Sequence, residues 1–467
     1  MFSEINLDNE KYRFDSEFFQ KKYLEVYSMI KNRPHTTIGK EYSCLTDFHS
    51  NGSYESIAEI FELLDHEDYA YMVRTTDLEK KDFKENIKYI SRKAYEFLSK
   101  SKVYGGELLI NKIGSPGRSF LMPKLEVPTS LGMNLFLIKI KEKSEINEKI
   151  IWIFLNTKYG KDVIQRKING TVPLTIDKEA IKSLYIPIFS KEIVLILSNI
   201  VEKILNYEKK ADLLYEKAKE KLLQELNLEK FNPSSENVAI KSLKESFLTT
   251  SRLDSEYYQK KYDELLLNLE KNRSEKLLNL VDIQTSIEPG SEYYQKDGIP
   301  FIRVQDFSKF KIETPSIFLD RHKFSDAINP KKNTILLSKD GSIGIAYKVN
   351  DDKNFITSSA ILHLQVKSKD ILADYLVLIL NSFIVKMQAK RDIGGSIIQH
   401  WRREDIEKTL IPIINLKKQE EICKLIVESQ AMREEAETLF TTIIKSMEIS
   451  MKESEEMGLE NLKNIKI

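Results

Sequence analysis

The chain has 467 residues, of which 41% are hydrophobic and 31% charged, and its formal net charge is +1. This length accommodates two ordinary domains with connectors, and this composition is typical of a globular protein with much helix surface. No apolar run is long enough to span a membrane, and the first residues lack the order of a signal peptide. The two cysteines match no metal-binding spacing, which favours a cytoplasmic location. The near-zero charge neither indicates nor excludes nucleic acid, because DNA binding requires only a local basic face.

The sequence contains the same unit twice. Residues 13–23 begin Arg-Phe-Asp-Ser-Glu, and residues 252–262 begin Arg-Leu-Asp-Ser-Glu. Ordered matches at a slowly drifting offset indicate a tandem duplication. The further matches, in order, are 71–78 with 300–307, 107–117 with 334–344, 166–171 with 391–396, and the two Ile-Pro-Ile steps that begin at Ile186 and Ile411.

Each copy is predicted to be an α+β domain. Its opening Asp-Ser pair can cap a helix, and apolar residues at helical spacing follow directly. Short β-rich runs are bounded by turn-forming residues, and helical stretches lie between them. The expected helices cover 19–30, 150–165, 258–269 and 373–390, and the clearest strands cover 135–140 and 361–366.

A long helix is predicted to follow each copy. Apolar or small residues alternate there at spacings of four and three, which is the pattern of a coiled-coil seam. The predicted seam residues are Ile193, Leu197, Ile200, Ile204, Tyr207, Ala211, Leu214 and Ala218, and then Ile422, Leu425, Ser429, Met432, Ala436, Leu439 and Ile443. The predicted divisions are a domain over 1–188, a long helix over 189–228, a second domain over 229–413, and a second long helix with a tail over 414–467.

The sequence shows no convincing site for covalent chemistry. It lacks a Gly-x-Gly-x-x-Gly loop, a phosphate-binding loop, a His-Glu-x-x-His zinc motif and a Gly-x-Ser-x-Gly elbow. It also lacks the Asn-Pro-Pro or Asp-Pro-Pro motif with which amino-methyltransferases hold a flipped base. The six histidines are scattered and form no ligand set. We therefore expect no catalytic residue, no metal and no cofactor.

Two glycine-containing segments, 114–117 and 341–344, are candidates for phosphate contact. Their backbone N–H groups and the serines Ser115 and Ser342 would face the phosphate, supported by Lys112 and Lys339. The alternative is a tight turn between strands, which is the commoner use of glycine.

Two other segments, 166–171 and 399–403, carry side chains suited to reading bases. Arg fits guanine O6 and N7, and Asn or Gln fits adenine N6 and N7 in the major groove. The alternative is a polar helix start, with Trp401 in the core. Arg74 and Arg303 are instead expected to pair with nearby aspartates. The candidate DNA-binding residues are Lys112, Ser115, Arg118, Arg166, Lys167, Asn169, Thr171, Lys339, Ser342, Gln399, His400, Trp401 and Arg402.

Three segments together resemble the specificity subunit of type I restriction–modification systems: 298–306, 335–344 and 411–422. The last of these reads apolar-Pro-apolar, a short spacer, and then a helix start with Gln419. The first copy departs from the pattern, because Val194 stands where Gln419 would be and Pro116 replaces Ile343.

The resemblance implies two target recognition domains, each reading one half of a split double-stranded DNA sequence. The two helices would form an antiparallel coiled coil that spaces the domains and docks two methyltransferase subunits, with restriction and translocation subunits joining the complex. The subunit itself would be non-catalytic. The alternatives are a coiled-coil scaffold that binds proteins, an enzyme with unrecognised motifs, and a specificity subunit of a type II-like enzyme.

Overall fold

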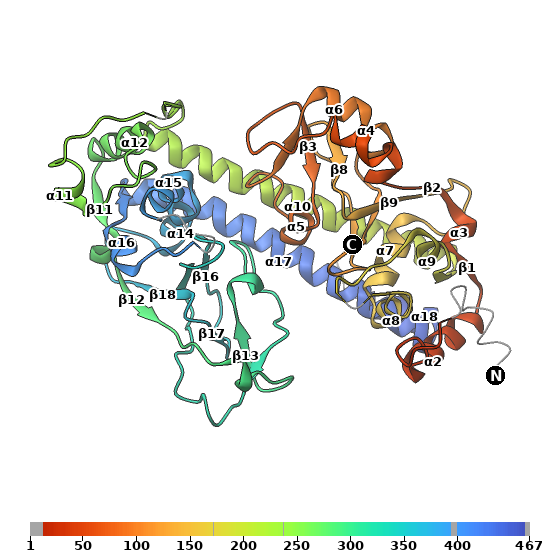
Figure 1. Cartoon of the computed structure of the whole chain (residues 1–467). Helices are drawn as coiled ribbons and strands as arrows, with labels where there is room; N and C mark the ends of the chain where they lie inside the picture. The colour runs from red at the N-terminus through yellow and green to blue at the C-terminus, as the bar shows by residue number, and fades with distance from the viewer. Residues whose placement is uncertain (1–12, 171, 237, 394–398, 463–467) are drawn as a thin grey trace. The chain divides into compact units, whose positions relative to one another are not determined.

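The computed structural model describes residues 13–170, 172–236, 238–393 and 399–462 (Figure 1). The chain folds as two compact units. Unit one comprises Met1–Glu208 and Glu434–Ile467, and unit two comprises Lys209–Arg433. None of the described helices is long and apolar enough to cross a membrane.

Within its described residues, unit one contains two four-stranded sheets and a two-stranded ribbon. The strands of the first sheet pair antiparallel. The second sheet contains one parallel pair, formed by β3 (Ala70–Val73) and β8 (Thr129–Leu131). In order, the first sheet is β2 (Tyr42–Asp47), β9 (Leu135–Ile140), β6 (Leu108–Asn111) and β7 (Ser119–Leu121). The second is β4 (Lys88–Ile90), β3 (Ala70–Val73), β8 (Thr129–Leu131) and β5 (Lys102–Val103), and the ribbon is β1 (His35–Thr37) with β10 (Tyr185–Pro187).

Unit two repeats this plan with a shorter second sheet. Its central sheet has the same strand order and the same antiparallel pairing as the first sheet of unit one. Its second sheet also contains one parallel pair, formed by β13 (Ile299–Ile302) and β17 (Ile356–Thr357). The central sheet is β12 (Val281–Thr285), β18 (Ile361–Val366), β15 (Ile335–Ser338) and β16 (Ala346–Lys348). The second is β14 (Phe318–Leu319), β13 (Ile299–Ile302) and β17 (Ile356–Thr357), and the ribbon is β11 (Ser274–Lys276) with β19 (Leu410–Pro412). The duplication expected from the sequence is therefore visible as repeated topology.

Two of the four expected helices, those over 150–165 and 373–390, are each broken in the middle. Thr157 separates α7 (Glu148–Asn156) from α8 (Lys158–Gln165), and its hydroxyl donates to Phe154 O and accepts from Gly160 N. Ser382 separates α14 (Ala373–Asn381) from α15 (Phe383–Asp392) in the same way, donating to Ile379 O. These local bonds compete with helix continuation, which explains why one helical pattern becomes two helices.

The Asp-Ser pairs do not cap the helix that follows them in either copy. These helices are α2 (Lys21–Lys31) and α12 (Lys260–Glu270), and they begin after Gln20 and Gln259 without a side-chain cap. Asp15 instead pairs with Arg13, whose guanidinium also donates to the carbonyls of Arg166 and Ile168 at 3.1 and 2.9 Å. Arg252 and Asp254 repeat this arrangement, and Arg252 donates to Asp392 O at 2.6 Å. The arginine thus ties the start of each repeated copy to the C-terminal end of α8 or α15.

The remaining helices are short. They are α3 (Ile38–Glu41), α4 (Tyr54–Ala58), α5 (Thr75–Lys80), α6 (Arg92–Phe97), α9 (Lys178–Lys182), α11 (Phe247–Thr250), α13 (Leu277–Leu280), α16 (Arg403–Lys408) and α18 (Glu455–Leu462), with 3-10 turns at Phe48–Asn51, Ser99–Ser101, Ser291–Tyr293 and Val304–Asp306.

The two long helices are α10 (Lys191–Glu225) and α17 (Leu416–Lys452), and each unit contains half of both. In unit two the halves run antiparallel, because Lys418 pairs with Glu225 while Arg433 pairs with Asp212. In unit one Ile193, Leu197, Ile200 and Ile204 share a buried cluster with Ala436, Leu439 and Ile443. Burial of one such aliphatic side chain contributes about 1.5–3 kcal/mol. The predicted fold class, tandem α+β units with two long antiparallel helices, is confirmed.

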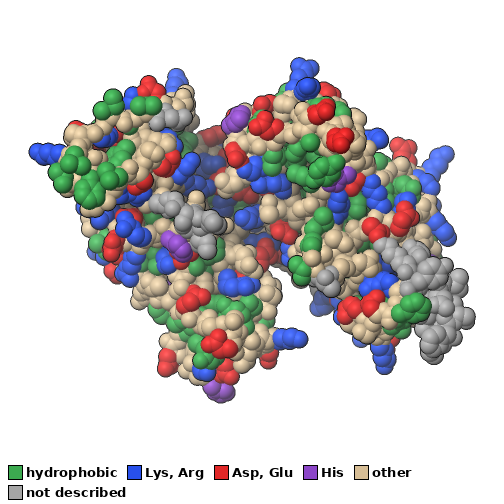
Figure 2. All heavy atoms as spheres, in the orientation of Figure 1, with side chains coloured by type: hydrophobic (Ala, Val, Ile, Leu, Met, Phe, Trp, Pro, Cys, Tyr) green, Lys and Arg blue, Asp and Glu red, His purple; other side chains and the backbone are tan. Residues whose placement is uncertain are grey.

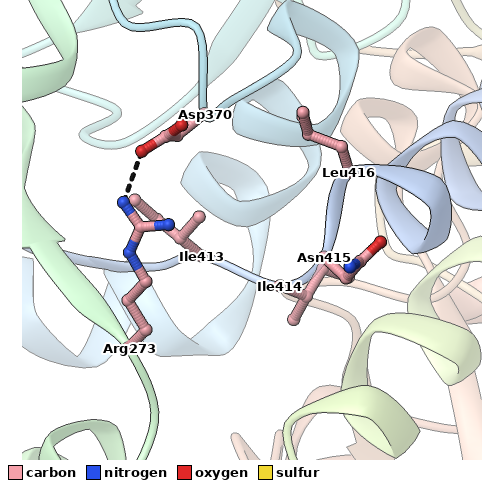
Figure 3. Close-up of a pocket in the computed structure, with 6 residues that line it drawn as sticks. All are labelled: Arg273, Asp370, Ile413, Ile414, Asn415 and Leu416. Atoms are coloured by element: carbon pink, nitrogen blue, oxygen red, sulfur yellow. Dashed lines mark hydrogen bonds and ion pairs between the residues drawn. The ribbon is translucent and has the colours of Figure 1, made fainter.

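Gln419 fastens the start of α17 to the body of unit two. Its side chain is fully buried, its Nε2 donates to the carbonyls of Asp370 and Ile414, and its Oε1 accepts from Leu372 N at 2.9 Å. A cavity of 320 Å³ lies beside this junction, lined by Arg273, Asp370, Ile413, Ile414, Asn415 and Leu416. Figure 3 shows Arg273 reaching Asp370 at one side of this cavity. Gln419 therefore has a structural role.

Replacing Gln419 by Val, the residue at the corresponding place in unit one, should lower the free energy of unfolding by about 2–4 kcal/mol. The reason is that three backbone groups at this half-buried junction lose their partner, and each group that is left unpaired away from water costs about 1–3 kcal/mol. Urea unfolding of the full chain measures the change. The control is Lys418→Ala, which removes an exposed ion pair with Glu225 and should lower the free energy of unfolding far less. Equal effects of the two variants would contradict this role of Gln419.

Candidate nucleic-acid interface

The two predicted phosphate loops are matching β-hairpin turns. Residues 112–118 join β6 to β7, and residues 339–345 join β15 to β16. Gly114 and Gly117 have φ of 85° and 86°, and Gly341 and Gly344 have φ of 72° and 77°. Glycine adopts this left-handed region without strain, so the turn itself explains these glycines.

In unit two the predicted base-reading segment lies directly against the hairpin turn. Trp401 N donates to Lys339 O at 2.8 Å, and Gly341 N donates to Gln399 O at 3.3 Å. Between them, Asp340 and His400 form an antiparallel bridge. The structure thus brings together two segments that the sequence analysis proposed separately.

Unit one has the same arrangement in the same backbone register. Ile176 N donates to Lys112 O at 3.0 Å, Gly114 N donates to Leu174 O at 3.2 Å, and Ile113 bridges Thr175. We call each combination a loop pair. The unit-one loop pair comprises residues 112–118, 166–170 and 172–177, and the unit-two loop pair comprises residues 339–345 and 399–402.

The hairpin lysine of each loop pair is neutralised by an aspartate. In unit one Asp47 accepts from Lys112 at 2.9 Å and pairs with Lys178 at 2.8 Å. Burial of Asp47 opposes ionisation, but hydrogen bonds from Lys178, Ser50 and Lys112 outweigh it and hold the pKa of this carboxyl well below its usual range. The cluster therefore contributes an ionised carboxylate with two ammonium groups at neutral pH.

In unit two the neighbouring residue supplies the carboxylate. Asp340 accepts from Lys339 Nζ at 2.5 Å and from His400 Nδ1 at 2.7 Å. Sequence analysis missed both aspartates. The adjacency of Asp340 to Lys339 was a usable signal, whereas the contact of Asp47 with Lys112 joins residues 65 positions apart and left no local pattern.

Four of the candidate residues are buried, which corrects their assignment as direct DNA contacts. Arg166 is 1% exposed and its guanidinium lies 4.2 Å and 4.3 Å from the ring centroids of Phe18 and Tyr27. Trp401 is 1% exposed, in agreement with the alternative that places it in the core. Lys112 and Lys167 are also buried. These side chains cannot reach a ligand outside the unit without a rearrangement, because each is enclosed by protein.

The other described candidates face solvent at least in part, and for these DNA contact remains a prediction. Ser115, Arg118, Ser342, Gln399, His400 and Arg402 are exposed, and Asn169 and Lys339 are half-buried. Thr171 lies outside the described residues. Both arginines among these exposed candidates have acidic partners, since Arg118 pairs with Glu79 and Arg402 pairs with Asp405. On the face drawn in Figure 2, lysine and arginine side chains are interspersed with acidic ones.

Arg74 and Arg303 form the local pairs that the sequence favoured. Arg74 bonds Asp77 through Nε and Nη2 at 3.1 and 2.6 Å, and Arg303 Nε bonds Asp306 at 3.2 Å. Among the described residues, no group of three His, Cys, Asp or Glu side chains is placed to hold a metal ion.

The sequence of unit two matches a known protein family. Residues 271–430 match the family described as type I restriction modification DNA specificity domain. Over this range, unit two is similar to type I restriction–modification specificity domains. The resemblance that the sequence motifs indicate is thereby confirmed, and the matched range includes the unit-two loop pair and Gln419. No curated protein sequence matches the chain.

Solved structures similar to the chain include two specificity subunits. The S subunit of a type I restriction–modification system from M. genitalium has 13% sequence identity and a TM-score of 0.39, covering 91% of this chain and 95% of its own. The HsdS subunit from Thermoanaerobacter tengcongensis has 11% identity and a TM-score of 0.27, covering 92% and 96%. A structure described as showing complex assembly and conformational transition of the type I R-M system has 12% identity and a TM-score of 0.28, covering 92% and 97%.

Proposed function

We propose that the chain is the non-catalytic DNA specificity subunit of a type I restriction–modification complex. Each α+β unit reads one half of a bipartite double-stranded DNA target. The recognition domains of this proposal are residues 1–188 and 229–413. The specificity domain matched at residues 271–430 implies DNA target recognition, and this proposal extends it to the first copy.

The observation that carries the proposal is the repetition of the loop pair. Both units place a hairpin turn and a second polar segment side by side through the same three backbone pairings. The exposed side chains on these segments differ between the units, as recognition of two different half-sites requires. Polar side chains on loops held by a rigid sheet are a common way to position base contacts.

The two long helices suit the roles of spacer and docking surface. Each is one uninterrupted helix of 35 or 37 residues, with a half in each unit. At 1.5 Å per residue such a helix is on the order of 50 Å long. We propose that the helices set the separation of the half-sites and dock two methyltransferase subunits, which restriction and translocation subunits then join.

Methylome mapping tests the proposal in a host that carries this chain with its methyltransferase. The expected result is a methylated motif in two parts separated by a fixed number of unspecified bases, because two units joined by helices read two half-sites. Gln399→Ala, on the exposed part of the unit-two loop pair, should change one half of the motif and leave the other unchanged. A continuous motif would contradict the proposal. A stable complex that methylates no motif would favour the protein scaffold instead.

A further inference from the structure

Asp340 holds two side chains of the unit-two loop pair at once. One carboxylate oxygen accepts from His400 Nδ1 at 2.7 Å, and the other accepts from Lys339 Nζ at 2.5 Å. The Asp340 and Lys339 side chains are 21% and 22% exposed, while the His400 side chain is 62% exposed. The carboxylate is therefore sheltered and the imidazole faces outward.

This geometry determines which ring nitrogen of His400 carries the proton. An ionised carboxylate only accepts hydrogen bonds, so Nδ1 must be the donor to Asp340. In the neutral ring the other nitrogen, Nε2, then has a free lone pair and is an acceptor. Because the ammonium of Lys339 occupies the second carboxylate oxygen, both oxygens of Asp340 are engaged within the protein.

The backbone holds this pair in register. Asp340 and His400 face each other in an antiparallel bridge, flanked by the bonds from Gly341 N to Gln399 O and from Trp401 N to Lys339 O. The adjoining Trp401 is buried in the core of unit two. The orientation of the ring is thus set by its carboxylate partner and by a backbone anchored in the core.

Unit one has no equivalent pair. Ile113 and Thr175 occupy the bridge positions of Asp340 and His400. Neither side chain is ionisable, so the described residues of the unit-one bridge offer no fixed imidazole acceptor.

We propose that His400 is a specificity-determining residue and that Asp340 is the positioning residue that fixes its tautomer. With Nε2 as an acceptor, His400 takes a hydrogen bond from an exocyclic amino group in the major groove, which is adenine N6 or cytosine N4. Guanine and thymine present acceptors at the corresponding edges, so they are disfavoured at this position. The proposal rests on the proposed function, because it needs unit two to read a DNA half-site.

The tautomer is tested without DNA. The full chain, labelled with ¹⁵N-histidine, is studied by NMR at about pH 8, where a histidine ring is ordinarily neutral. The His400 signals, assigned with His400→Gln, should show a protonated Nδ1 and an unprotonated Nε2. In Asp340→Asn the asparagine can accept or donate, so the two ring forms should mix. The matched control Asp351→Asn changes an exposed aspartate of the same unit and should leave the wild-type pattern. A wild-type ring protonated at Nε2 would overturn the proposal.

The base preference is tested by methylome mapping with the complete complex. Wild type should require adenine or cytosine at one position of one half-site. His400→Ala and Asp340→Asn should each reduce that preference by about tenfold, in line with the loss of one good base contact, and leave the other half-site unchanged. The control Asp351→Asn, an exposed change elsewhere in unit two, should preserve the preference.

The outcomes separate this inference from the proposed function. A bipartite motif that is unchanged in both His400→Ala and Asp340→Asn would overturn the role of His400 and leave the proposed function standing. If no bipartite motif is found in wild type, the proposed function fails whatever the tautomer is. A motif that changes in His400→Ala but not in Asp340→Asn would retain the base contact and overturn the positioning role of Asp340.

Discussion

Asp47→Asn should lower the free energy of unfolding by about 3–5 kcal/mol, because it leaves the buried ammonium of Lys112 without its counter-charge. Lys112 is 9% exposed and has Asp47 as its ion-pair partner at 2.9 Å, and Lys178 pairs with the other oxygen at 2.8 Å. Asparagine keeps the shape of the side chain but not its charge. Urea unfolding of the full chain, followed by a probe in unit one, measures the loss.

The same variant makes a prediction about pH. The folded pKa of Asp47 lies below its unfolded value, so this carboxylate stabilises the fold above about pH 5 and loses that effect as the pH falls. The stability difference between wild type and Asp47→Asn should therefore shrink between about pH 5 and pH 2. The control is Glu79→Gln, which breaks the exposed pair with Arg118 and should cost less than about 1 kcal/mol at neutral pH. A difference that is constant across this pH range would show that charge is not the cause.

Trp401→Ala should lower the free energy of unfolding by about 3–5 kcal/mol, since it leaves a cavity where a large side chain was buried. Trp401 belongs to the core cluster of unit two, together with Tyr375, Ile406 and Ile411. Its Nε1 is buried without a hydrogen-bond partner within the part of the chain that the structure describes. Trp401→Phe removes this unpaired donor and fills most of the space, so it should cost less than about 1.5 kcal/mol.

The comparison of these variants decides between a core role and a DNA-reading role for Trp401. The exposed neighbour Gln399, changed to Ala, should shift the free energy of unfolding by no more than about 0.5 kcal/mol while altering the methylated motif. Trp401→Phe should leave the motif as it is in wild type. A stable Trp401→Phe variant with an altered motif would instead place the indole at the DNA.

Periodic and local features of this fold are predictable from the sequence. The strands at 135–140 and 361–366 follow from the spacing of apolar side chains, and so do most of the predicted seam residues of the long helices, which are buried. The predicted seam residues Tyr207, Leu214, Leu425 and Met432 are only half-buried. The breaks at Thr157 and Ser382 were not predicted, because a hydroxyl bond to a preceding carbonyl leaves no trace in hydrophobic periodicity. The repeated plan itself was visible because both copies retain the same turns and helix starts.

The loop pairs were predictable only as separate segments. What joins them is backbone pairing between positions about 60 residues apart, and side-chain type does not encode it. The burial of Arg166 shows the limit most clearly, since a charged residue beside Lys and Asn suggested a surface. Phe18 and Tyr27, which enclose its guanidinium, come from a distant part of the chain.

The division of both long helices between the units has a consequence for biosynthesis. Unit two is contiguous, whereas unit one needs residues from both sides of it. Ile193, Leu197 and Ile200 are buried in one cluster with Ile443 and Met447. A ribosome adds Ile443 and Met447 after the whole of unit two, so this cluster cannot form before then. The unit that is translated first can therefore complete its core only last.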